Sequence, residues 1–261
     1  MKINVYQVDA FASKAFEGNP AAICPLSEWP PDITMQAIAA ENNLSETAFF
    51  VPNDDYYELR WFTPSLEVDL CGHATLAAAY VLFEELGYQA AEIRFSTKSG
   101  ILCVARSNGL LRMDFPVQAP LPFELPTQLV EAFGGAPVDC LKSTDIIAVY
   151  SSEELVRTVV PDMALLEQLD CRGIIITAES KDYDFVARWF GPRTGIKEDP
   201  VTGSAFTQLV PYWANRLGKT SFKAKQVSPR GGEVLCELAG DRVLISGRAV
   251  LFMRGVIEIE I

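Results

Sequence analysis

Hydrophobic residues are concentrated in two long runs of similar length. The first, residues 72–86, consists of strong helix formers and ends at Gly87, a residue type that favours the position after a helix. It is apolar almost all round, so the predicted helix must be enclosed, and we expect it to pass through the middle of a curled sheet. The second run, residues 203–217, predicts a matching helix that Pro211 should kink or break.

Shorter segments with alternating or β-branched residues predict strands. These segments are residues 3–8, 58–62, 100–105 and 110–115. A further helix is predicted on the surface over residues 30–43. Its apolar side is expected to carry Ile33, Ala37, Ile38 and Ala40.

The chain contains an internal repeat. Arg60-Trp61-Phe62 recurs as Arg188-Trp189-Phe190, and Gly72 and Gly203 each open one of the long apolar runs. The two glycines lie 131 positions apart, as do the Leu-Gly pairs that close the runs. Landmarks repeated in the same order over half a chain indicate a duplicated domain, because solenoid repeats are only about 20–50 residues long.

The repeat sets the expected domain organisation. Residues 116–122 contain three prolines, with another at Pro126, and such density is typical of a linker. We therefore expect an N-terminal domain over residues 1–115 and a C-terminal domain over 116–261, with a strand at about 250–261 that could return to the first domain. The fold class is α+β, each domain being a curled, mostly antiparallel sheet wrapped around a central helix.

Composition excludes several classes of function. The 261 residues include 22 basic and 34 acidic side chains, a net charge of −12, and no basic cluster. A chain of that charge repels phosphate groups, so nucleic acid and anionic membrane surfaces are not expected partners. The N-terminus lacks the apolar stretch of a signal peptide, and the longest uncharged runs are shorter than the roughly 20 residues of a membrane span.

Cysteine and histidine usage points to a cytoplasmic protein. The six cysteines are dispersed without a CxxC pair, which is typical of reduced, buried thiols. With one histidine, His73, the sequence predicts no zinc site. GxGxxG and GxSxG motifs are absent, so a dinucleotide cofactor and a serine-nucleophile elbow are not supported.

The two predicted helix N-termini are candidate anion sites. Each offers unpaired N–H groups and the positive end of a helix dipole, and Gly72 and Gly203 would let a ligand approach closely. If the halves are related by a pseudo-twofold axis, both ends could hold one small carboxylate in a shared cleft. A structural alternative exists, because Gly203 and Ser204 are also common caps, whereas His73 at the matching position is not a preferred cap.

Acidic residues near these helices are candidates for proton transfer. Glu46 precedes Thr-Ala-Phe-Phe, so it is expected to be partly desolvated, although a solvated loop glutamate is the simpler interpretation. Asp199 lies just before the second helix, where a turn-opening Asp-Pro would serve equally well. Cys71 and His73 are two residues apart at a helix start, so we expect them to point in different directions and to make a poor nucleophile–base pair.

Four motifs occur in order along the chain: Gly18-Asn19-Pro20-Ala21-Ala22, Asn43-Leu44-Ser45-Glu46-Thr47-Ala48-Phe49, Cys71-Gly72-His73-Ala74-Thr75 and Asp199-Pro200-Val201-Thr202-Gly203-Ser204-Ala205. Together they closely resemble the phenazine-biosynthesis isomerase (PhzF-like) family. The resemblance implies a diaminopimelate epimerase-like fold of two pseudo-symmetric domains, a homodimer, and proton transfer between carbons of a small carboxylic acid without a cofactor.

The resemblance also assigns roles to individual residues. It implies that Glu46 is the proton shuttle and that His73 and Asp199 belong to the catalytic set. Substrate-binding positions are implied at Asn19, Gly72, Gly203 and Ser204.

Two alternatives remain open. Epimerases of this fold use two opposed cysteines, and here Cys71 occupies one position but Thr202 the other. A threonine hydroxyl is far too weak an acid for that role, so Glu46 is the better base. A binding or interaction protein with the same fold is the other alternative, although it would have no need to keep Glu46, His73, Asp199 and Ser204 together.

Overall fold

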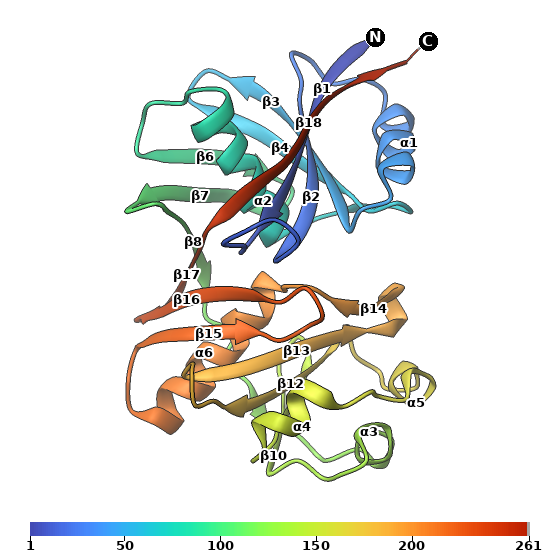
Figure 1. Ribbon diagram of the computed structural model, residues 1–261, viewed down its shortest axis with the longest axis vertical. Helices are drawn as coiled ribbons and strands as arrows, with labels where there is room; N and C mark the ends of the chain where they lie inside the picture. The colour runs from blue at the N-terminus through green and yellow to red at the C-terminus, as the bar shows by residue number, and fades with distance from the viewer. Residues whose placement is uncertain (260–261) are drawn as a thin grey trace. The chain divides into compact units, whose positions relative to one another are not determined.

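The computed structural model describes residues 1–259 and divides into two compact units (Figure 1). The first unit contains Met1–Asp114 and the residues from Ser246 onwards, and the second contains Phe115–Ile245. Strand β18 (Ala249–Glu258) pairs with β1 (Lys2–Ala10) in antiparallel register and so belongs to the first unit. Residues 260–261, at the end of the predicted strand 250–261, lie outside the described residues.

The sheet of the first unit combines antiparallel and parallel pairs. β1 pairs with β2 antiparallel, β2 with β3 parallel, β3 with β4 antiparallel and β4 with β6 parallel. The sheet continues antiparallel from β6 through β7 to β8. The remaining strands of this unit are β2 (Asn19–Pro25), β3 (Glu46–Asn53), β4 (Tyr56–Phe62), β5 (Glu67–Val68), β6 (Glu92–Thr97), β7 (Gly100–Ser107) and β8 (Leu110–Pro116).

The predicted central helix of this unit is confirmed. It consists of α2 (Gly72–Tyr80) followed by a π-helical turn, η1 (Val81–Glu85), and Gly87 follows with a φ of 70°. Every residue from His73 to Ala79 is buried, and α2 contacts β1, β2, β3 and β18. An all-round apolar sequence therefore folds as a helix enclosed by its own sheet.

The surface helix α1 (Asp32–Asn42) forms as predicted, but its buried side was assigned wrongly. Met35, Ile38 and Ala39 are buried, whereas Ile33, Ala37 and Ala40 are exposed. The helix is weakly amphipathic, so its apolar positions alone do not identify the side that packs on the sheet.

The second unit repeats this order of elements. β10 pairs with β11 antiparallel, β11 with β12 parallel, β12 with β13 antiparallel, β13 with β15 parallel and β15 with β16 antiparallel. The same sequence of parallel and antiparallel pairs links β1, β2, β3, β4, β6 and β7. The strands of the second unit are β9 (Leu121–Pro122), β10 (Asp139–Lys142), β11 (Ile146–Val149), β12 (Ile174–Glu179), β13 (Phe185–Gly191), β14 (Ile196–Asp199), β15 (Ser221–Gln226), β16 (Gly232–Ala239) and β17 (Arg242–Gly247).

Helix α6 (Gly203–Leu217) corresponds to α2, and it runs through Pro211 without the predicted break. Proline has no N–H to donate to the carbonyl of Thr207 four residues earlier. The N–H of Gln118 donates to that carbonyl instead, at 3.1 Å, so the acceptor is satisfied. The other helical segments of this unit are α3 (Thr127–Phe133), α4 (Glu153–Thr158), α5 (Met163–Glu167) and η2 (Pro192–Thr194).

The duplicated Arg-Trp-Phe motif has the same structural role in both units. Arg60 on β4 pairs with Glu67 on β5, and Arg188 on β13 pairs with Glu198 on β14, each through two nitrogens at 2.7 and 2.9 Å. Each arginine thus holds a short strand against a long one. Among residues 1–259, no helix is long and apolar enough to span a membrane.

Candidate active site

Glu46 is the first residue of β3, placed there by the turn that ends α1. Asn43 adopts a left-handed conformation with a φ of 50° and terminates the helix, and the chain then enters β3. The Glu46 side chain is 11% exposed. The buried residues that follow it in β3 therefore place this carboxylate at the edge of an apolar core.

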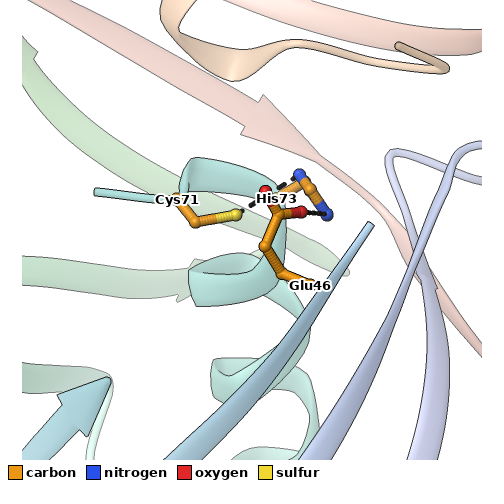
Figure 2. A group of neighbouring side chains, drawn as sticks. All are labelled: Glu46, Cys71 and His73. Carbon is orange, nitrogen blue, oxygen red and sulfur yellow. Dashed lines mark hydrogen bonds and ion pairs between the residues drawn. The ribbon is translucent and has the colours of Figure 1, made fainter. Parts of the chain in front are cut away.

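His73 lies opposite Glu46, in the first turn of α2. Its Nε2 is 3.1 Å from Oε2 of Glu46 (Figure 2). These two buried atoms have no hydrogen-bond partner among the described residues beyond this ion-pair contact. A pair of incompletely satisfied buried polar atoms indicates a place where a ligand would supply the missing partner.

Two neighbours contact the other ring nitrogen of His73. Sγ of Cys71 lies 3.5 Å from Nδ1, and the side-chain nitrogen of Asn19 lies 3.2 Å from it. Ser45 in turn donates to Oδ1 of Asn19 at 3.3 Å. The prediction that Cys71 and His73 point apart is wrong, because Cys71 is the extended N-cap residue, to which helical spacing does not apply.

The environment shifts the pKa values of this cluster in a consistent direction. Burial opposes the charged imidazole of His73, but the neighbouring Cys71 and Glu46 outweigh burial and raise its pKa well above the ordinary value. We attribute this mainly to the Glu46 carboxylate, because burial raises the pKa of Cys71 to about 11 and so keeps it a neutral thiol near pH 7. The imidazole beside Glu46 therefore keeps its proton to a higher pH than a free histidine does.

We expect the His73–Glu46 pair to make stability depend on pH. A folded-state pKa above the ordinary value of about 6.5 gives a stabilisation that is full below that pH and is lost as the pH rises through the folded-state pKa. The melting temperature of the wild-type protein should therefore fall relative to that of His73→Gln when the pH is raised from 6 to 9. His73 is the only histidine, so one imidazole NMR signal reports its titration directly; a midpoint at or below 6.5 would contradict the assignment.

The same cluster offers metal-ligand atoms, which the sequence did not predict. One ligand atom each from Glu46, Cys71 and His73 lie within 4.8 Å of one another. However, Cys71 and Glu46 contact opposite nitrogens of the imidazole. A single ion held by the ring would lie on one side of it, so this arrangement fits an acid–imidazole pair better than a three-ligand metal site.

The predicted residues of the second unit gather at the start of α6. Asp199 ends β14, is 7% exposed, and accepts a hydrogen bond from the hydroxyl of Thr202, the N-cap residue. Gln226 donates to the Asp199 carbonyl at 2.7 Å and accepts from the Thr202 N–H at 2.9 Å. Gly203 is buried and Ser204 is half-buried.

The helix ends differ from ordinary capped helices. Neither Cys71 before α2 nor Thr202 before α6 makes a side-chain capping hydrogen bond. First-turn N–H groups thus keep their capacity for an anion. The expectation that both helix ends face one shared cleft stays a prediction.

Sequence reasoning missed one contact of Ser204. Its Oγ accepts hydrogen bonds from both terminal nitrogens of Arg172, each at 3.1 Å. The available signal was the repeat itself: aligning the two Arg-Trp-Phe motifs places Arg172 near the position of Ser45, immediately before Glu46.

Comparison with known proteins assigns this arrangement to a family. The family model described as phenazine biosynthesis-like protein matches residues 8–255. The chain belongs to the PhzF-like family. An uncharacterized isomerase of Pseudomonas aeruginosa is 52% identical over 259 residues, covering 99% of this chain and 100% of the relative.

Solved structures agree with that assignment. A PhzF-family protein of Enterococcus faecalis superposes with a TM-score of 0.98 at 44% identity, covering 99% of this chain and 100% of that one. A probable proline racemase from Agrobacterium radiobacter has a TM-score of 0.65 at 11% identity, covering 99% of this chain and 93% of that one, and shows the fold alone. The predicted family and the α+β, diaminopimelate epimerase-like fold are confirmed, and the relatives named as isomerases support an isomerase in general.

Proposed function

We propose that the protein is a cofactor-independent isomerase of a small cyclic or amino carboxylic acid. Glu46 takes a proton from one carbon and returns it to another, acting first as base and then as acid. The observation that carries this proposal is the buried Glu46–His73 pair, whose facing oxygen and nitrogen lack other hydrogen-bond partners among the described residues.

The neighbouring groups support proton transfer by Glu46. The raised pKa of His73 lets its Nε2 keep a proton toward Glu46, which orients the Glu46 side chain. Asn19 contacts the far side of the imidazole and fixes its orientation. We propose that Asp199 completes the catalytic set, and that the amides at Gly72 and Gly203 and the hydroxyl of Ser204 bind the substrate carboxylate.

Solvent-hydrogen exchange tests the proposed function. A panel of small cyclic and amino carboxylic acids is first screened for thermal stabilisation, and each acid is then incubated with enzyme in D₂O and followed by NMR and mass spectrometry. We expect at least one acid to gain deuterium at a carbon-bound position. A panel that stabilises the protein without any exchange would instead support a binding protein with this fold.

Epimerisation by Cys71 is disfavoured by its environment. Burial raises the pKa of the thiol to about 11, and Thr202 stands at the matching position before α6. We expect iodoacetamide at pH 7.5 to leave both Cys71 and turnover unaffected, since a buried, protonated thiol is a poor nucleophile. Peptide mapping should show alkylation first at the half-buried Cys103, Cys140 and Cys171; rapid loss of activity with modification of Cys71 would favour the epimerase.

The family resemblance also leads us to propose a homodimer. Phe16 and Phe252 of the first unit are 70% and 46% exposed, and the centroids of their rings lie 5.8 Å apart. Exposed aromatic side chains that adjoin one another are typical of association surfaces. Sedimentation velocity of the purified chain tests the proposal.

A further inference from the structure

Arg172 controls the direction in which the Ser204 hydroxyl donates. A hydroxyl has one hydrogen to donate and two lone pairs to accept, whereas a guanidinium only donates. Because Nη1 and Nη2 of Arg172 both approach Oγ of Ser204 at 3.1 Å, the hydroxyl hydrogen must point away from the arginine. Its one hydrogen is therefore left for an acceptor on the side away from the guanidinium.

A buried carboxylate fixes Arg172 in this position. Asp145 is completely buried, and its Oδ1 accepts from Nε of Arg172 at 2.8 Å while its Oδ2 accepts from Nη2. Gln208, one turn after Ser204 in α6, donates to the same Oδ2 at 2.8 Å and accepts from the Asp145 N–H at 3.0 Å. The Arg172 side chain nevertheless remains 37% exposed, so the guanidinium is accessible to a ligand.

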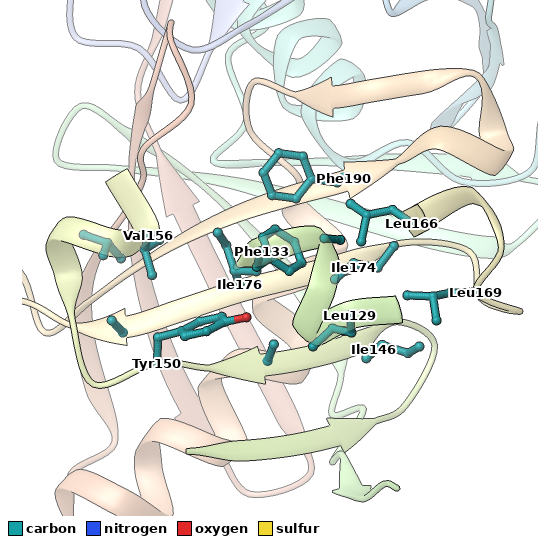
Figure 3. Close-up of a cluster of buried hydrophobic side chains, with 14 residues drawn as sticks. Leu129, Phe133, Ile146, Tyr150, Val156, Leu166, Leu169, Ile174, Ile176 and Phe190 are labelled. Atoms are coloured by element: carbon teal, nitrogen blue, oxygen red, sulfur yellow. The ribbon is translucent and has the colours of Figure 1, made fainter. Parts of the chain in front are cut away.

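The strand that follows Arg172 is anchored in the core of the second unit. Arg172 lies just before β12, in which Ile174 and Ile176 point into a cluster that includes Phe133 of α3 and Phe190 of β13 (Figure 3). Close packing of this kind leaves little freedom for the residues at the start of the strand. The position of Arg172 is thus set from both sides, by the core behind it and by Asp145.

The internal repeat places this contact at the counterpart of the proposed proton shuttle. Thr47 is opposite Phe62 in the first unit, and Ile174 is opposite Phe190 in the second. Since Phe62 and Phe190 end the two Arg-Trp-Phe motifs, Glu46 corresponds to Gly173. His73 and Ser204 likewise correspond, as the second residues of α2 and α6.

Glycine stands at this second position, against a buried aromatic ring. A Cβ at Gly173 would lie 2.3 Å from the ring of the buried Trp189, so any side chain there would require that ring to shift. In the second unit the neighbouring Arg172 contacts Ser204, the second residue of α6. In the first unit Glu46 contacts His73, the second residue of α2. The two copies therefore present different chemistry at equivalent places, an acid–imidazole pair in one and a guanidinium–hydroxyl pair in the other.

We propose that Arg172 is a positioning residue that holds the Ser204 hydroxyl as a hydrogen-bond donor and so selects substrates that present a carboxylate to the N-terminus of α6. This inference rests on the proposed function, because it concerns recognition of the same acid. A carboxylate accepts from the oriented hydroxyl and is favoured by the positive end of the helix and by the adjacent guanidinium. A neutral amide of the same shape carries no charge, so it gains much less from the helix end and from the guanidinium.

Binding of benzoate and of benzamide tests the proposal, with dissociation constants measured by NMR titration. The wild-type protein should bind benzoate at least tenfold more tightly than benzamide. Arg172→Lys keeps a positive charge beside Asp145, but a single ammonium cannot reproduce the fork that holds both partners. The preference is the ratio of the benzamide dissociation constant to the benzoate dissociation constant. We expect this ratio to fall roughly tenfold in the variant, as when a charge-assisted hydrogen bond is removed.

The variants distinguish positioning from a general structural role. Ser204→Ala should lower the preference by the same factor of roughly ten, Ser204→Thr should keep it, and Arg172→Lys in the Ser204→Ala background should cause no further loss. Arg193→Lys is the matched control, since Arg193 pairs with the exposed Asp170 and should leave the preference unchanged. If Arg172→Lys does not fold, the two Ser204 variants still decide the question.

Several outcomes would overturn the proposal. These are a wild-type protein that does not prefer benzoate, an Arg172→Lys variant that retains the full preference, and additive losses in the double variant. Failure of the proposed function appears instead as absent hydrogen exchange, which this binding experiment does not involve.

Discussion

Glu46→Gln should abolish deuterium exchange into the acid that the wild-type protein turns over, with a loss of about a thousandfold or more. Glutamine keeps the size and a hydrogen-bonding oxygen, but it cannot accept and return a proton. General acid–base groups typically contribute about 10²–10⁴ in rate, and here one group performs both steps. The measurement is the rate of label incorporation by NMR, with enzyme and substrate otherwise unchanged.

Two controls make the Glu46 result specific. Glu84→Gln, on the half-exposed side chain of η1, should exchange at the wild-type rate. The melting temperature of Glu46→Gln should show that the variant is folded, because the amide still fits beside His73. An exchange rate close to that of the wild type would show that another group is the base.

Arg188→Met should destabilise the second unit by about 3–5 kcal/mol, the usual cost of leaving one partner of a buried ion pair alone. The Arg188 side chain is 9% exposed, and besides Glu198 it donates to the carbonyls of Val156 and Val159 at 3.2 and 2.7 Å. Methionine would leave these acceptors unsatisfied. Hydrogen exchange of the β12–β14 peptides under increasing urea measures the loss for this unit by itself.

The repeat supplies a matched control for Arg188. Arg60 makes the same two contacts to Glu67, but its side chain is 21% exposed and its third partner, Asp32, is on the surface. Water can replace more of its hydrogen bonds, so Arg60→Met should cost clearly less. Equal losses in the two variants would show that burial of the arginine does not determine the effect.

Much of the fold could be predicted because the signals are local and repeated. The enclosed helix follows from the apolar run that ends at Gly87, and the duplication follows from equal spacing of its landmarks. The buried side of α1 was predicted wrongly because its apolar residues lie on more than one side. The continuity of α6 through Pro211 depends on Gln118, a residue distant in sequence that no local pattern reveals.

The candidate site could be predicted from the sequence only in part. Motif resemblance identified Glu46, His73, Asp199 and Ser204, but not the contacts among them. The approach of Cys71 to His73 depends on the extended backbone of an N-cap residue, which helical periodicity cannot describe. Arg172 gave no signal of its own, because it reaches Ser204 across 32 residues through packing that only the folded unit creates.

The glycine at position 173 has a consequence for stereochemistry. Racemases that invert a centre place one base on each face of the carbon, so that hydrogen leaves from one face and arrives at the other. This chain carries the Glu46 carboxylate in one copy of the repeat, and Gly173 stands at the matching place in the other copy. With Glu46 as both base and acid, the proposed reaction returns hydrogen to the face from which it was taken, and we expect a suprafacial shift.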